Sequence, residues 1–171
     1  MKQRIGISGH VEISHWRDGK RINYISSHNM IVDDGLEYFA WMTKEMLSPS
    51  GAVVAPTALT VSVGISDVPA RRTDTELGEE LSPKVTITTA SLPAAPLTNV
   101  TQLAFSLAGD EGNPTAPDTI REIGLYGTPI IAGVTYTNKM IARMVLPSPG
   151  IAKVFGDLLC VSWFITFKRK I

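Results

Sequence analysis

The histidines and the cysteine are the residues of this sequence whose types could support metal binding or nucleophilic chemistry. His10 and His15 are separated by an odd number of positions, so on a strand their rings point to opposite faces and cannot share a metal ion. His28 is isolated, and a site there would need partners from elsewhere in the chain or from another subunit. Cys160 lies in an apolar run, which is typical of a small buried residue. We therefore predict no metal-ligating residue and no nucleophile.

Motifs for acyl transfer, phosphate binding and calcium binding are absent from the sequence. It contains no G-x-S-x-G elbow, no G-x-G-x-x-G loop and no Walker lysine. Adjacent carboxylates occur at Glu79-Glu80 and Asp110-Glu111, a pattern typical of a solvated loop, and the second pair lacks the spaced oxygens of an EF-hand. Two carboxylates brought together by the fold remain open as a hydrolase alternative. We predict that the protein is not an enzyme, with no catalytic residue, no cofactor-binding residue and no cofactor.

The length and charge of the chain narrow the remaining classes of function and partner. The chain has 171 residues, which predicts a single domain over residues 1–171. Its 16 Lys and Arg balance 16 Asp and Glu, which argues against a nucleic-acid partner. The N-terminus lacks the apolar core of a secretory signal, and the longest apolar stretch, residues 158–167, is far shorter than a membrane span, so no membrane partner is expected. Charged residues make up only 19%, which suggests that surface is hidden in an assembly.

Hydrophobic periodicity predicts many strands around one helix. Residues 5–13 alternate between apolar and polar, and Asp18-Gly19 is a hairpin turn signal, so a hairpin opens the domain and runs to about Met30. After Asp33-Asp34, apolar residues recur at three- and four-residue spacing, which predicts a helix near residues 34–46. Further strands are predicted at 57–65, 84–90, 100–107, 120–126, 140–146 and 158–167. This pattern predicts a mainly β fold, an antiparallel β-sandwich (jelly-roll-like) with one packed helix.

Two strand positions have specific expected packing roles. Trp163 shares a strand face with Val161, Ile165 and Phe167, so we predict that it is a core residue rather than a ligand platform. Gly124 has no side chain, so we expect another backbone or a large ring to approach it closely.

Five groups of residues follow one another in a characteristic order. They are residues 9–13 with 18–20 and 29–35, L-T-V-S-V-G at 59–64 with T-D-T-E-L-G-E-E at 73–80, R-E-I-G-L-Y at 121–126, A-R-M-V-L at 142–146 with I-A-K at 151–153, and V-S-W-F-I-T-F at 161–167. This ordered set resembles the small virion structural proteins of bacteriophages. The resemblance covers most of the chain.

The resemblance implies a β-sandwich building block of the tail, collar, fibre or baseplate type, repeated by symmetry in the virion. Its expected partners are further copies of itself and other phage structural proteins, and it would be made in the cytoplasm of the bacterial host. The absence of a long shaft favours a short adaptor, anchor or cement subunit, so a capsid decoration protein that stabilises the head is the alternative. A carbohydrate-binding module is less favoured, because Trp16 and Trp41 are its only candidate aromatic platforms.

Candidate interface residues follow from the same assembly hypothesis. The predicted contact regions are the helix, where Tyr38 and Trp41 lie off the main apolar stripe, the opening hairpin, and the long loops at 109–117 and 127–138. The candidates are Trp16, Tyr38, Trp41, Asp110, Glu111 and Tyr136.

Overall fold

The computed structural model describes residues 4–47, 53–54, 59–86, 89–91, 100–115, 118–128, 130–131 and 134–170. Within these ranges the fold is mainly β, as predicted, with one helix. The helix is α1 (Asp33–Leu47), and the strands are β1 (Arg4–Arg17), β2 (Lys20–Ile31), β3 (Val53–Val54), β4 (Leu59–Gly64), β5 (Glu80–Thr86), β6 (Thr89–Ser91), β7 (Val100–Leu107), β8 (Glu122–Gly127), β9 (Ile130–Ile131), β10 (Val134–Thr135), β11 (Lys139–Val145) and β12 (Leu158–Lys170).

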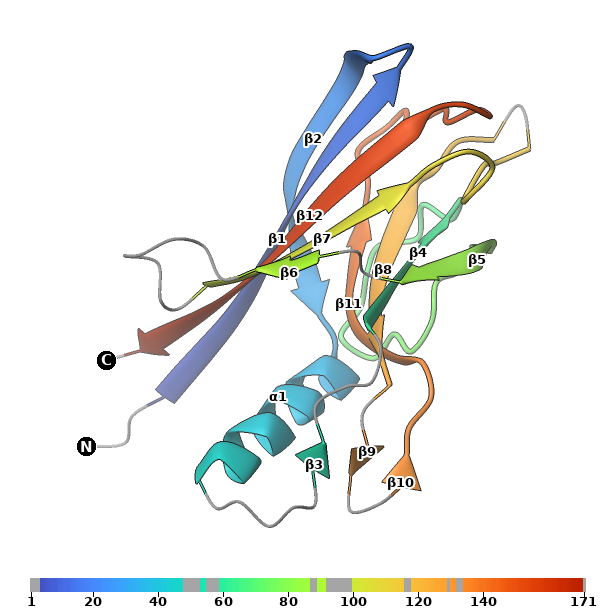
Figure 1. The fold of residues 1–171 in the computed structure, drawn as a ribbon. Helices are drawn as coiled ribbons and strands as arrows, with labels where there is room; N and C mark the ends of the chain where they lie inside the picture. Colours follow the sequence, from blue (N-terminus) through green and yellow to red (C-terminus); the bar gives the residue numbers. More distant parts are fainter. Residues whose placement is uncertain are drawn as a thin grey trace.

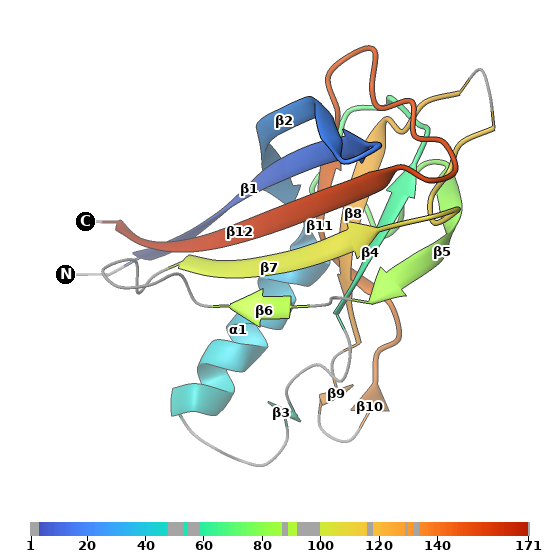
Figure 2. The ribbon, with the colours of Figure 1, turned by 45° about the horizontal axis from the view of Figure 1, so that its top comes forward.

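Nine strands form one antiparallel sheet in the order β5-β4-β8-β11-β2-β1-β12-β7-β6 (Figure 1). The sheet curls into a half-barrel, so that β5 contacts β7 across its open side (Figure 2). The two separate sheets expected of a sandwich or jelly-roll are not confirmed, because β11 pairs directly with β2 and joins the two arms of the sheet. A small sheet of β10, β9 and β3 lies near α1. Residues 127–138, expected to be a loop, therefore contain two short strands.

The opening hairpin has the predicted position and turn. Asp18 and Gly19 both have positive φ, 51° and 72°, and Arg17 pairs with Lys20. Positive φ at both central residues is what a type I′ turn requires, the turn that Asp-Gly favours in two-residue hairpins. The alternation along β1 is also confirmed, since Val11 is buried in the core. The hairpin tip lies at the end of the molecule opposite α1 (Figure 1).

Helix α1 begins within one residue of its predicted start and packs tightly against β11. A Cβ atom on Gly35 would lie 2.1 Å from the carbonyl oxygen of Ile141, so this close approach requires glycine. Tyr38 and Phe39 are both buried, whereas Ala40 is exposed. Tyr38, which was predicted to lie off the main apolar stripe, therefore belongs to the buried face of the helix.

The core lies on the concave side of the curled sheet and contains Trp163, as predicted. Trp163 is fully buried, its ring 6.5 Å from that of Phe105, and its Nε1 has no hydrogen-bond partner among the described residues. Close ring approach at Gly124 is also confirmed, because a Cβ there would lie 2.9 Å from the ring of Tyr126.

Strand β5 differs from its prediction by beginning at Glu80, four residues early. It contains Pro83, which cannot donate a hydrogen bond to a neighbouring strand. β5 tolerates proline for two reasons. It is an edge strand, and its pairing with β4 is irregular, with a shift of register between Val61 and Val63.

Candidate functional site

Three charged residues from the resembling segments meet in one buried cluster. Arg143 on β11 donates from Nε to Oε2 of Glu122 at 2.9 Å and from Nη1 to Oδ2 of Asp74 at 2.6 Å, while Nη2 also donates to the carbonyl of Val68 at 3.1 Å. Burial opposes the charge on Arg143, but the hydrogen bonds to both carboxylates outweigh it and raise the pKa of the guanidinium. The fold thus neutralises a buried arginine with two acidic partners.

Glu122 connects this cluster to the loop between β4 and β5. Its Oε1 accepts the backbone N–H of Glu79 at 2.9 Å, and its Oε2 accepts that of Gly78 at 3.1 Å. The backbone N–H of Leu77 donates to the hydroxyl of Tyr126, whose pKa is raised chiefly by burial. Both carboxylate oxygens of Glu122 accept hydrogen bonds, so this cluster holds the loop between β4 and β5 in place.

A second buried cluster forms around Asp157, just before β12. Its Oδ2 lies 2.7 Å from Nε2 of His15, while Arg17 donates from Nε to Oδ1 and from Nη2 to Oδ2, each at 2.8 Å. These hydrogen bonds, above all those from Arg17, hold the pKa of Asp157 well below its usual range and raise that of Arg17. The end of the opening hairpin is therefore bound to the chain segment that leads into β12.

Asp157 also closes a tight turn that presents Phe155. Its Oδ2 accepts the backbone N–H of Val154 at 3.0 Å, and its own N–H donates to the carbonyl of Val154 at 3.1 Å. Gly156 has a φ of 90°, which a residue with a side chain rarely adopts. At the tip, the side chain of Phe155 is 80% exposed and that of Val154 is 50% exposed. We call residues 153–157 the Phe155 turn.

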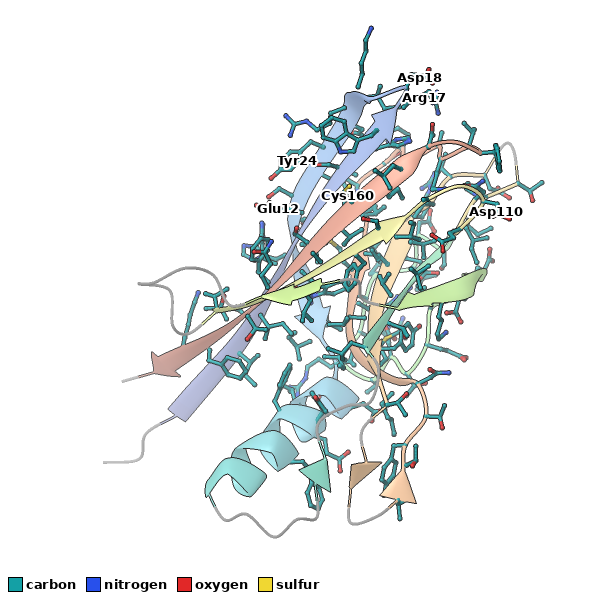
Figure 3. All side chains as sticks on the ribbon, in the orientation of Figure 1. Glu12, Arg17, Asp18, Tyr24, Asp110 and Cys160 are labelled. Atoms are coloured by element: carbon teal, nitrogen blue, oxygen red, sulfur yellow. The ribbon has the colours of Figure 1, made fainter. Side chains whose placement is uncertain are left out.

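Lys153 fixes the other side of the Phe155 turn. Its side chain is buried, and Nζ donates to Oδ1 of Asn113 at 2.6 Å and to the carbonyl of Gly109 at 2.9 Å. Burial lowers the pKa of this amine, partly offset by nearby carboxylates. The Phe155 turn is thus tied both to the hairpin and to the loop after β7, and these segments occupy one end of the molecule, where Figure 3 marks Arg17, Asp18 and Asp110.

The six predicted interface residues fall into two groups. Trp16 pairs with Leu158 next to the Phe155 turn, and Asp110 and Glu111 lie in the loop after β7 that Lys153 contacts. Glu111 accepts the backbone N–H of Ala108 through Oε2 at 2.8 Å. At the α1 end, Tyr38 is buried and Trp41 donates to Oε1 of Glu37 at 3.4 Å. Tyr136 is 39% exposed beyond β10. The structure therefore does not bring the six together, and their interface role stays a prediction.

The histidines and the cysteine have partly unexpected positions. His10 and His15 do face opposite sides of β1, but His28 is not isolated, because the strand register places its ring 5.5 Å from that of His10. Among the described residues, no group of three or more histidine, cysteine or acidic side chains is arranged to hold a metal ion. Cys160 is partly exposed, so the expectation of a buried residue was wrong. It lies on the outer face of β12, opposite the face of Trp163.

Phe155 and Asp157 were not predicted as functional residues, and Lys153 was named only as part of the resembling segment I-A-K. The available signal was the segment V-F-G-D, an aromatic residue beside a Gly-Asp turn signal.

No helix in the part of the chain that the structure describes has the length and apolar character needed to cross a membrane. No family model, no curated protein and no solved structure matches the chain.

Proposed function

We propose that this protein is a non-enzymatic assembly subunit that associates with further copies of itself through the Phe155 turn. The observation that carries the proposal is an 80% exposed phenylalanine on a turn held by buried charged residues on both sides. Burying such a side chain in a partner is worth about 1.5–3 kcal/mol. Aromatic anchors of this kind commonly dominate the energy of protein interfaces.

The rigidity of the turn strengthens this interpretation. Asp157 and Lys153 are buried charges, and their dehydration costs free energy that the fold must recover through hydrogen bonds. Their hydrogen bonds fix the backbone on either side of Phe155 before any partner binds. A pre-organised anchor loses less conformational entropy on association, which favours binding. The balanced charge of the chain, 16 basic against 16 acidic residues, also leaves little net repulsion between copies.

The setting we propose is a bacteriophage virion, with the protein as a subunit of the tail, collar or fibre. The support is the ordered resemblance described above, together with the structural use of its polar residues. Asp74, Glu122, Arg143 and Lys153 all come from the resembling segments, and all hold loops in place. This use suits a building block better than a catalyst. In this setting the two arms of the curled sheet would act as the layers of a modified sandwich around one core.

The self-association proposal is tested with Phe155→Ala in the full chain. Wild-type protein is expected to form an oligomer in sedimentation velocity, and the variant to shift towards monomer with an unchanged Tm. Tyr24→Ala is the matched control, because Tyr24 is an aromatic residue 47% exposed on β2, outside the residues 153–157 that form the turn. If the Phe155 variant associates as the wild type does, the turn is not the interface. If the wild type is monomeric at every concentration, self-association itself is refuted.

The virion proposal is tested separately by cryo-EM of the phage particle that carries this chain. Density for the half-barrel at the tail, collar or fibre is the expected result. Density on the capsid lattice would instead identify a head decoration protein. A particle without this fold would overturn the virion proposal.

A further inference from the structure

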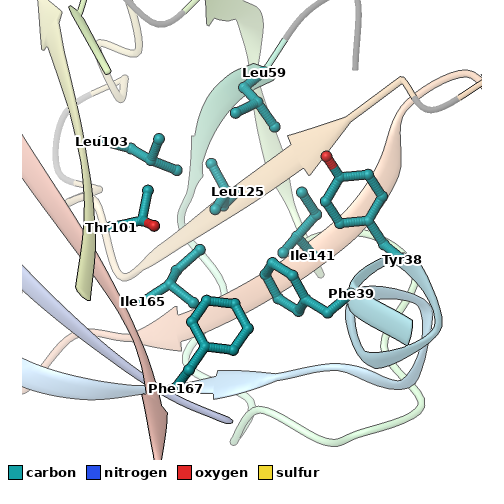
Figure 4. Close-up of a pocket in the computed structure, with 9 residues that line it drawn as sticks. All are labelled: Tyr38, Phe39, Leu59, Thr101, Leu103, Leu125, Ile141, Ile165 and Phe167. Carbon is teal, nitrogen blue, oxygen red and sulfur yellow. The ribbon is translucent and has the colours of Figure 1, made fainter. Parts of the chain in front are cut away.

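A cavity of about 110 Å³ lies between α1 and the concave side of the curled sheet (Figure 4). Tyr38 and Phe39 line it from the helix. Leu125 on β8 lines it from one arm of the sheet, and Leu103 on β7 and Phe167 on β12 line it from the other. The cavity therefore lies where the helix and both arms of the sheet come together.

The lining determines which ligands could enter. Among the described residues that line the cavity, only Tyr38 and Thr101 carry a side-chain polar atom, and in both it is a hydroxyl. Burial raises the pKa of Tyr38 to about 12, so this hydroxyl is uncharged at neutral pH. A charged ligand would lose its hydration here without gaining a charged partner, at a large cost in free energy. The site is therefore suited to an uncharged, apolar molecule.

The size of the cavity and the geometry of the rings around it narrow the class of ligand further. An apolar cavity of about 150 Å³ is known to stay dry and to bind benzene or xenon. Three rings border this slightly smaller space: those of Phe39 and Phe167 are 5.6 Å apart at 88°, and those of Tyr38 and Phe39 are 5.5 Å apart at 62°. Such edge-to-face arrangements attract a further ring, because the positive edge of one ring faces the negative face of another.

We propose that this cavity is a binding site for a small uncharged aromatic molecule of about the size of benzene. The guest would restore packing contacts that the cavity walls lack. The site is independent of the Phe155 turn, which lies at the opposite end of the molecule.

The first experiment measures the Tm of the full chain with benzene and with n-hexane. Because a ligand stabilises only the folded state, benzene at about ten times its Kd is expected to raise the Tm by about 3 °C. n-Hexane, which lacks a ring, is expected to raise it less. An equal or larger shift with n-hexane would overturn the aromatic assignment. No shift with either would overturn the site.

The second experiment locates binding with Thr101→Ile, which places a larger side chain in the cavity. This variant is expected to lose most of the benzene-induced Tm shift. Thr60→Ile is the matched control, since Thr60 is also a strand threonine but does not line the cavity. Equal benzene shifts in the two variants would place binding elsewhere and refute the proposal. If Thr101→Ile fails to fold, Leu103→Phe replaces it, with loss of fluorobenzene line broadening in ¹⁹F NMR as the readout.

Discussion

His15 and Asp157 are 142 positions apart in the chain, yet Nε2 of the histidine lies 2.7 Å from Oδ2 of the carboxylate. Both side chains are buried. Arg17 and the backbone N–H of Val154 bind the same carboxylate, so both of its oxygens accept hydrogen bonds. This contact makes the end of the opening hairpin and the Phe155 turn a single rigid unit.

Replacing Asp157 with Asn is expected to destabilise the protein by about 3 kcal/mol, because the buried His15 and the partly exposed Arg17 both lose a buried, charged acceptor. Urea denaturation measures the change in free energy of unfolding. Asp118→Asn is the control, since the side chain of Asp118 is exposed, and its effect should lie within about 0.5 kcal/mol. Equal stability of the two variants would show that the Asp157 contacts contribute nothing net.

The same carboxylate predicts an acid-dependent loss of stability. The pKa of Asp157 is lower in the folded protein than its usual value of 3.8, chiefly because of its hydrogen bond from Arg17. The charged form therefore stabilises the fold above about pH 4, and this contribution is lost as the pH falls below that value. The free energy of unfolding of the wild type should fall steeply between pH 4 and pH 2. A matching slope in Asp157→Asn would assign the acid sensitivity to other groups.

The buried pair of Glu122 and Arg143 is expected to be strongly coupled. Arg143→Met leaves Glu122 buried without its charged partner and should cost about 3–5 kcal/mol. The double variant with Glu122→Gln should cost less than the sum of the single changes, by about 1 kcal/mol or more in urea denaturation.

The exposed pair of Arg121 and Asp67, with 3.3 Å between Nη1 and Oδ2, provides the control cycle. Its coupling should be between about 0 and 1 kcal/mol, because water screens both groups. Equal coupling in the two cycles would contradict the special role of burial at Arg143.

Trp163 is expected to stabilise the folded protein through its volume alone. Trp163→Ala should cost about 3–5 kcal/mol, because it opens a large void in the core. Trp163→Phe should cost clearly less, since Nε1 has no hydrogen-bond partner among the described residues. Chemical denaturation of both variants tests this. An equally severe loss in the phenylalanine variant would show that the indole N–H makes an essential hydrogen bond.

The sequence by itself determined those features that depend on neighbours a few residues away. Asp18-Gly19 specified its hairpin because both residues tolerate positive φ, and the start of α1 followed from Asp33-Asp34 and the change of hydrophobic period. Trp163 was assignable to the core because alternate residues of one strand share a face. These are local rules, and the structure follows them.

The tertiary structure alone decided how distant segments meet. The half-barrel depends on the β11–β2 pairing, the cavity on the approach of α1 to both arms of the sheet, and the pairing of His10 with His28 on a register between two strands. The segment V-F-G-D indicated a turn, but it did not show that Asp157 is buried within it. Burial is a property of all the segments that surround a side chain, and here the main partner of Asp157, Arg17, lies 140 positions away, beyond the reach of any periodicity or turn signal.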